Sequence, residues 1–124
     1  MVSGGPTVLK NQRITPALIE EMERYTAFAP LHTPIATYIM REAMSLFHGI
    51  ANFVCLDTYF HHHMPEVVTR LPIPEEYVEM GVRHYGAYGL SYESFVYQLK
   101  PAVPQKLIVA HLGNGASVAA IRDG

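Results

Sequence analysis

The sequence predicts an α/β fold in which helices pack on a β-sheet. Two segments in the first fifty residues combine a helix-start signal with apolar residues at helical spacing. An apolar segment of strand length follows them, and the last eighteen residues have the pattern of a β-hairpin. Alternation of helical and strand patterns in this order is typical of a sheet covered by helices.

Composition narrows the classes of function. The chain has 124 residues, which is enough for one domain. Its nine basic residues are nearly balanced by eleven acidic ones, so the charge gives no reason to expect nucleic acid or an anionic membrane as a partner. No segment approaches the apolar length of a membrane span, and residues 1–7 lack a signal-peptide pattern, so we expect neither insertion nor export. Cys55 is the only cysteine. It excludes an internal disulfide, fits a reducing cytoplasm, and is expected to be a small buried apolar residue.

Two helices are predicted before residue 50. Thr15 and Pro16 form an N-cap followed by proline at the first helical position, and Thr33 with Pro34 repeats this signal. Gly49 is a suitable stop for the second helix. The predicted inward faces consist of Leu18, Met22, Tyr25 and Ala29 in the first helix, and of Ile35, Tyr38, Ile39, Ala43 and Leu46 in the second.

The middle of the chain predicts a strand and two further helices. Residues 50–56 are apolar enough for a central strand, and residues 75–80 suit a short helix after a proline-marked connection. Ser91 is a candidate cap for another helix, before Pro101 and Pro104 lead into the C-terminal segment. The inward residues of that helix are expected to be Tyr92, Phe95, Val96 and Leu99.

The C-terminal segment predicts a hairpin of strands 107–110 and 116–122. The residues between the strands are His111, Leu112, Gly113, Asn114 and Gly115. Asn-Gly between two apolar runs is a strong hairpin signal, and an ordinary tight turn is one interpretation. The other is a phosphate cradle, because two glycines expose backbone N–H groups, Asn114 and Ser117 add donors, and His111 ends the strand.

Asp57 follows the predicted central strand, where ligands of open α/β sheets collect. The alternative is a local turn that Asp57 caps with Thr58 as its partner. The next histidines, His61, His62 and His63, are consecutive, so they cannot all face one ion in regular structure, and no cysteine or carboxylate stands at ligand spacing. We therefore expect a solvated loop with at most one buried histidine and predict no metal site within it.

Four segments, in order along nearly the whole chain, resemble signatures of the acetate kinase family, which are carboxylate kinases of the actin and sugar-kinase superfamily. Residues 29–34 resemble Ala-Pro-Leu-His-Asn-Pro, and residues 56–65 resemble Phe-Asp-Thr-Ala-Phe-His-Gln-Thr-Met-Pro. Residues 81–92 resemble Gly-Val-Arg-x-Tyr-Gly-Phe-His-Gly-Thr-Ser-His. His-Leu-Gly-Asn-Gly-Ala-Ser is present unchanged at residues 111–117.

The resemblance implies a ribonuclease H-like fold with helices packed on a mixed sheet. Residues 1–101 would be a portion of the first, carboxylate-binding lobe, and residues 102–124 the opening β-hairpin of the second, nucleotide-binding lobe. Family members begin earlier, with a strand that bears an asparagine and a positively charged group near the phosphates, and they carry a substrate-gripping arginine shortly before the segment that residues 2–5 resemble. They continue into an Asp-Thr-Ser-Met-Gly segment, further nucleotide loops, a catalytic arginine and an acidic metal ligand. The chain thus resembles a middle portion of the family. The family forms homodimers largely through the second lobe, so the resemblance implies no dimer for this portion.

By resemblance, the activity is transfer of the ATP γ-phosphoryl group to acetate or a similar short-chain carboxylate, giving an acyl phosphate, with Mg²⁺ and ATP or ADP. Because the substrate carboxylate is already ionised, Asp57 would orient Mg²⁺ or its waters rather than act as a base. His32 would donate to the substrate or the phosphoryl group. Residues 111–115 would hold nucleotide phosphates through their backbone, and the acyl pocket would include Val2, Leu31 and Ala87.

Three departures from the family pattern bear on activity. Tyr88 stands where the family has a transition-state-stabilising histidine, Ala87 replaces an aromatic pocket residue, and Tyr92 replaces a second histidine. A phenol carries no positive charge, and loss of one such stabiliser costs about 10²- to 10³-fold in rate. Ala87 would widen the pocket toward a larger acyl group, while plain packing also explains the two tyrosines. Two hypotheses follow: an incomplete, weak or inactive carboxylate kinase, or a non-catalytic nucleotide- or partner-binding module.

Overall fold

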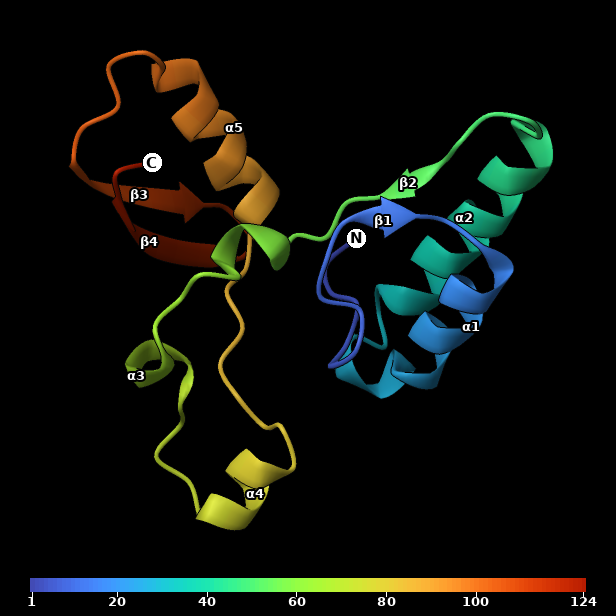
Figure 1. Cartoon of the computed structure of the whole chain (residues 1–124), viewed down its shortest axis with the longest axis horizontal. Helices are drawn as coiled ribbons and strands as arrows, with labels where there is room; N and C mark the ends of the chain where they lie inside the picture. Colours follow the sequence, from blue (N-terminus) through green and yellow to red (C-terminus); the bar gives the residue numbers. More distant parts are fainter.

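The computed structural model describes all of residues 1–124 and confirms the α/β class. Figure 1 shows an open arrangement, with α1, α2, β1 and β2 on one side, α5 and the β3–β4 hairpin on the other, and α3 and α4 on a long excursion between them. None of the helices has both the length and the apolarity needed to cross a membrane. The elements are β1 Gln12–Arg13, α1 Pro16–Arg24, a 3-10 turn Thr26–Phe28, α2 Thr33–Leu46, β2 Phe53–Val54, a 3-10 turn Tyr59–His61, α3 Glu66–Thr69, α4 Glu75–Glu79, α5 Gly89–Leu99, β3 Lys106–Leu112 and β4 Ala116–Arg122.

The strands form two small antiparallel sheets, β1–β2 and β3–β4. In the first, Gln12 pairs with Val54, and in the second, Leu107 pairs with Ile121. The predicted strand 50–56 is reduced to Phe53–Val54, because only the short β1 is available to pair with it. The sequence of β1 is polar and gave no strand signal. The predicted hairpin and the short helix α4 are both confirmed.

The first core lies where α1 packs against α2 and the β1–β2 sheet. Its buried residues are Val8, Ile14, Leu18, Ile19, Met22, Met40, Val54 and Leu56. The predicted cap of α1 is confirmed, since the Thr15 hydroxyl accepts a hydrogen bond from the Leu18 N–H at 3.1 Å. The helix ends at Arg24, earlier than predicted, so Tyr25 and Ala29 lie outside it.

The inward face of α2 differs from the predicted one. Its buried residues are Thr33, Thr37 and Met40, and the Thr37 hydroxyl donates to the Thr33 carbonyl at 3.0 Å, which makes a threonine face compatible with burial. The predicted apolar stripe faces away from the core, with Ile39 58% exposed and Leu46 71% exposed. The helix ends before Gly49, whose φ of +83° suits the predicted stop.

The second core joins α5 to the C-terminal hairpin through Tyr92, Val96 and Ile121. Tyr92 and Val96 face inward as predicted, whereas Phe95 is exposed. The helix begins at Gly89 rather than at a Ser91 cap, because a carboxylate from elsewhere in the chain binds its first N–H groups, as described below. Cys55 is exposed rather than buried, since it lies on the uncovered side of the first sheet.

The Tyr92 hydroxyl is buried in the second core without a hydrogen-bond partner. Removing it by Tyr92→Phe is expected to raise the free energy of unfolding by about 1 kcal/mol, because the cost of burying the unpaired hydroxyl disappears while the ring stays packed. Urea denaturation measures this difference. Tyr38→Phe, at an exposed tyrosine of α2, is the matched control and should change little. A lower stability for Tyr92→Phe would contradict the prediction.

Candidate functional site

The Asp57 side chain, which follows β2, forms hydrogen bonds with the N-terminus of α5. One carboxylate oxygen accepts a hydrogen bond from the Tyr88 N–H at 2.8 Å, and the other accepts from the Leu90 N–H at 3.0 Å. The side chain is half-buried, and these are charge-assisted bonds to otherwise unpaired donors at a helix start. Asp57 therefore caps a helix that lies 31 residues further along the chain, rather than a local turn with Thr58.

Tyr88 is held against the glycine-rich turn of the hairpin. Its backbone is in the left-handed region, with φ of 54°, which is uncommon for a residue with a side chain. The ring stacks on His111, with ring centroids 4.1 Å apart and an interplanar angle of 11°. A Cβ at Gly115 would lie 1.9 Å from the Tyr88 hydroxyl, so this glycine is needed for the close approach.

His111 links this contact to α5, because its Nδ1 lies 3.0 Å from the Ser91 hydroxyl oxygen. The structure thus brings Asp57, Tyr88, His111 and Gly115 together. β3 extends beyond the predicted strand 107–110 to Leu112, so the turn itself is Gly113, Asn114 and Gly115. Leu112, Gly113 and Asn114 are exposed to solvent. The backbone of the turn is open to an anion from outside, while the side facing α5 is occupied by the Tyr88 ring.

The other predicted site residues are spread over the exposed surface. His32 is the N-cap residue of α2 and makes no side-chain capping bond. Leu31, beside it, is 79% exposed, and Val2 is also exposed. Ala87 is exposed, and its carbonyl lies 2.9 Å from His61 Nε2. These residues do not form an enclosed acyl pocket in this chain, because no element covers them.

The three consecutive histidines have local structural partners. His61 is partly buried, and its ring lies where a Cβ on Gly86 would be, so it packs directly on that backbone. His62 stacks on Tyr59, with ring centroids 4.5 Å apart, and its Nδ1 lies 2.7 Å from the Tyr59 carbonyl. His63 is exposed and lies against the His62 ring. Stacking and backbone contacts account for this segment.

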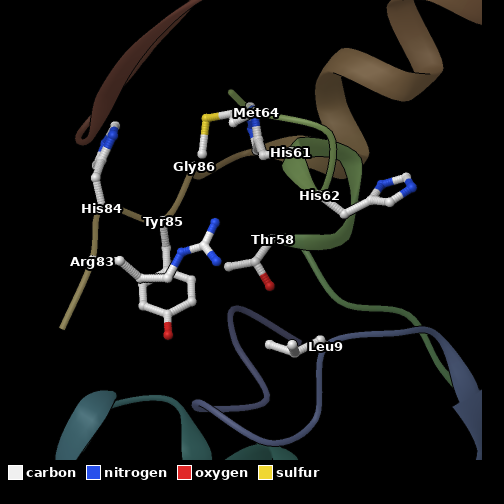
Figure 2. Close-up of a pocket in the computed structure, with 9 residues that line it drawn as sticks. All are labelled: Leu9, Thr58, His61, His62, Met64, Arg83, His84, Tyr85 and Gly86. Atoms are coloured by element: carbon white, nitrogen blue, oxygen red, sulfur yellow. The ribbon is translucent and has the colours of Figure 1, made fainter. Parts of the chain in front are cut away.

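A small cavity of about 80 Å³ is lined by Thr58, the residue that follows Asp57, and by Arg83 and Tyr85 among others (Figure 2). Figure 2 shows the Arg83 guanidinium directed toward Thr58, and the group lies over the Tyr85 ring at 5.6 Å from its centroid. Arg83 was not predicted as a site residue. Its place in the third family-like segment, two residues before Tyr85, was the available signal.

The described residues do not by themselves form a magnesium site. They contain no group of three His, Cys, Asp or Glu side chains arranged to hold a metal ion. Both Asp57 oxygens already accept backbone N–H groups, which leaves this carboxylate poorly suited to bind an ion directly.

Replacement of Asp57 by asparagine tests its capping role. Asp57→Asn removes the charge and turns one oxygen into an N–H donor facing another donor, so the free energy of unfolding is expected to fall by about 2 kcal/mol. The same substitution at the exposed Asp123, whose left-handed backbone asparagine tolerates, is the matched control. Urea denaturation of both variants measures the two changes in the free energy of unfolding. Equal midpoints would show that Asp57 contributes nothing to the attachment of α5.

The α/β fold of this chain, which joins a strand-end carboxylate, a helix start and a glycine-rich turn, belongs to the actin and sugar-kinase-like class of folds, as do its solved structural neighbours. The sequence profile of the acetokinase family matches residues 1–124, and the chain belongs to this family.

Individual relatives agree with this assignment. The chain is 38% identical over 130 residues to acetate kinase 1 of Neisseria meningitidis serogroup B, covering 100% of this chain and 33% of that protein. It is 36% identical over 126 residues to acetate kinase of Rhodopseudomonas palustris strain TIE-1, covering 98% and 32%. The chain therefore spans about a third of the length of these relatives.

Solved structures show the same relationship. A propionate kinase from Francisella tularensis superposes with a TM-score of 0.85 at 35% identity, covering 99% of this chain and 33% of that one. Acetate kinase from Entamoeba histolytica gives a TM-score of 0.88 at 28% identity, covering 99% and 32%. The predicted family and fold are confirmed.

Proposed function

We propose that this chain supplies part of a carboxylate kinase that transfers the γ-phosphoryl group of ATP to acetate or a similar short-chain carboxylate. The contact of Asp57, Tyr88 and His111 carries the proposal, because it joins residues 1–101 to the hairpin of residues 102–124 at the phosphate-type turn. The division into a first-lobe portion and the opening of a nucleotide-binding lobe is part of the same proposal. The second core spans the boundary between these two portions, because Tyr92 and Val96 of α5 pack on Ile121 of the hairpin.

In the proposed reaction, a carboxylate oxygen attacks the γ-phosphorus while the bond to the β,γ-bridging oxygen breaks, giving an acyl phosphate and ADP. Two anions must meet, so the protein's task is to position them and to offset their charge. The backbone N–H groups of residues 113–115 would bind nucleotide phosphates, with Mg²⁺ arriving on the nucleotide. His32 would donate to the substrate or phosphoryl group, and Val2, Leu31 and Ala87 would contribute to the acyl pocket.

Asp57 would act in this scheme mainly as a positioning residue. Its carboxylate holds the Tyr88 backbone, and the Tyr88 ring in turn contacts His111 of the phosphate-type turn. An exposed, unpaired Cys55 is compatible with the cytoplasm, where thiols stay reduced.

A second candidate function is a non-catalytic nucleotide- or partner-binding module. The observation that favours it is the Tyr88 ring, which covers one side of the turn where the family carries a cationic histidine. A phenol can donate one hydrogen bond but cannot offset the charge of the transferring phosphoryl group. The turn could therefore still bind phosphates without supporting turnover.

Thermal unfolding with and without Mg·ADP tests nucleotide binding by this chain. We expect millimolar Mg·ADP to raise the Tm, since a ligand at about 100 times its Kd adds about 2.7 kcal/mol to the free energy of unfolding. Mg²⁺ with adenosine, which lacks phosphates, is the control and should produce no rise. A Tm unchanged by millimolar Mg·ADP would exclude phosphate binding by this hairpin in isolation.

A further inference from the structure

The cavity in Figure 2 lies where three segments that are distant in the sequence meet. Its lining comes from Leu9, from the segment 58–64 after β2, and from residues 83–86, which return from α4 to α5. Two polar contacts hold the second and third segments together. His61 Nε2 lies 2.9 Å from the Ala87 carbonyl oxygen, and the Asp57 carboxylate accepts the Tyr88 N–H. The walls of the cavity are therefore in place before any ligand binds.

The lining carries positive charge and contains no carboxylate. Arg83 is the only lysine or arginine in it, and a guanidinium stays charged at any physiological pH. This arginine makes no ion pair, whereas three other arginines of the chain each pair with a glutamate. Asp57, the nearest acidic residue in the sequence before Thr58, has both oxygens bonded to N–H groups at the start of α5. The charge of Arg83 is thus left free for an anion from solution.

Two hydrogen-bond donors converge on the cavity. The Arg83 guanidinium lies over the Tyr85 ring, and this contact occupies one face of the group while its N–H donors stay free in the plane. Figure 2 shows the guanidinium directed toward Thr58, whereas the His62 and His84 rings point away from it. The Thr58 hydroxyl makes no capping bond to the 3-10 turn that follows it. Both donors can therefore turn to a ligand.

We propose that this space, the Arg83 cavity, binds a small phosphate-type oxyanion. The guanidinium would donate to two of its oxygens, and the Thr58 hydroxyl would donate to a third. A carboxylate has only two oxygens, so phosphate fits this set of donors better. The volume of about 80 Å³ has room for one such anion but not for a nucleotide, since sites for larger ligands typically hold about 300 Å³ or more.

The Arg83 cavity is separate from the glycine-rich turn. None of Gly113, Asn114 and Gly115 lines it, so the proposal does not depend on the proposed phosphoryl transfer. An anion held by Arg83 and Thr58 would join the two segments that Asp57 already joins through its bond to the Tyr88 N–H. Because a ligand of the folded state stabilises that state, phosphate is expected to strengthen the attachment of α5.

Amide NMR of the ¹⁵N-labelled chain tests the proposal. The chain is titrated with sodium phosphate, and sodium chloride at matched ionic strength serves as the reference. We expect the signals of Thr58 and residues 83–86 to shift and to saturate at millimolar phosphate. Signals of residues 113–115 report separately on the glycine-rich turn. Arg83→Gln should weaken binding at the cavity at least about tenfold, because the charge-assisted hydrogen bonds are lost.

Three further titrations show which groups hold the anion. Arg122→Gln, at an exposed arginine of β4 outside the cavity, is the matched control and should leave binding unchanged. Thr58→Val keeps the shape of the side chain and removes its hydroxyl, so it should weaken binding about threefold or more. Acetate should bind more weakly than phosphate.

The proposal is overturned by any of three results. The first is the absence of saturable shifts at Thr58 and residues 83–86. The second is equal binding by Arg83→Gln and the unchanged chain, and the third is acetate binding as tight as that of phosphate. Shifts confined to residues 113–115 would also overturn it, while they would support phosphate binding by the turn.

Discussion

In a full-length hybrid, Tyr88→His is expected to raise acyl phosphate formation at least about tenfold, because one transition-state stabiliser is typically worth 10²- to 10³-fold in rate. The hybrid carries residues 1–124 in place of the matched third of Neisseria meningitidis acetate kinase 1. In this chain the Tyr88 ring stacks on His111 and its hydroxyl lies against Gly115. Histidine at this position could carry positive charge toward the transferring phosphoryl group, and its smaller ring would free part of the turn.

Acyl phosphate formation is measured by trapping the product with hydroxylamine, at saturating acetate and ATP, so that changes in kcat are seen. Tyr97→His is the matched control, since Tyr97 is an exposed tyrosine of α5, the helix for which Tyr88 is the N-cap residue. Tyr88→Phe distinguishes the ring from the hydroxyl, because it keeps the stack on His111 and removes only the polar atom. A rate for Tyr88→His no higher than that for Tyr97→His would refute the role proposed for position 88.

The largest loss of stability is expected from Gly89→Ala, at the first residue of α5. A Cβ at this buried position would lie 2.0 Å from the Asp57 carbonyl oxygen and 2.7 Å from the Phe60 Cβ. Neither neighbour is the end of a flexible side chain, so the backbone itself must move, and the two hydrogen bonds from Asp57 would be disturbed with it. We expect the free energy of unfolding to fall by about 3 kcal/mol or more.

Gly113→Ala is the control for this substitution. A Cβ at Gly113 would meet its nearest atom at 3.7 Å, an ordinary van der Waals contact, and the position is exposed. The urea midpoints of the two variants should therefore differ widely. If Gly89→Ala does not accumulate as soluble protein, limited proteolysis of the full-length hybrid carrying each variant gives the comparison. Similar protease resistance for both variants would contradict the close packing at Gly89.

The sequence predicted elements whose signals are contained within a few residues. The Thr15 cap, the stop at Gly49, the helix α4 and the C-terminal hairpin all formed as expected. These features depend on local backbone geometry and hydrogen bonds between near neighbours, so few distant contacts can override them. The four family-like segments were also readable directly, and they identified the acetokinase family.

Long-range contacts explain most of the differences. Asp57 and Tyr88 are 31 residues apart, and no local pattern indicates that a carboxylate after β2 will cap α5 in place of Ser91. The brief, polar β1 forms only because β2 lies opposite it. The stacking of Tyr88 on His111 likewise requires the hairpin to pack on α5.

By itself, the sequence determined the family, the α/β class, the hairpin and the start of the first helix. The second helix begins at Thr33 with His32 as its N-cap residue, in place of the predicted Thr33 cap. Only the tertiary structure decided which faces are buried, and α2 and Cys55 show why. Apolar spacing defines a stripe on a helix, but burial requires another element to cover that stripe. In this chain Thr37 and Met40 are covered by the first core, while Ile39 and Cys55 line an open apolar groove. Hydrophobicity can be read from one residue, whereas burial is a property of the surfaces that meet.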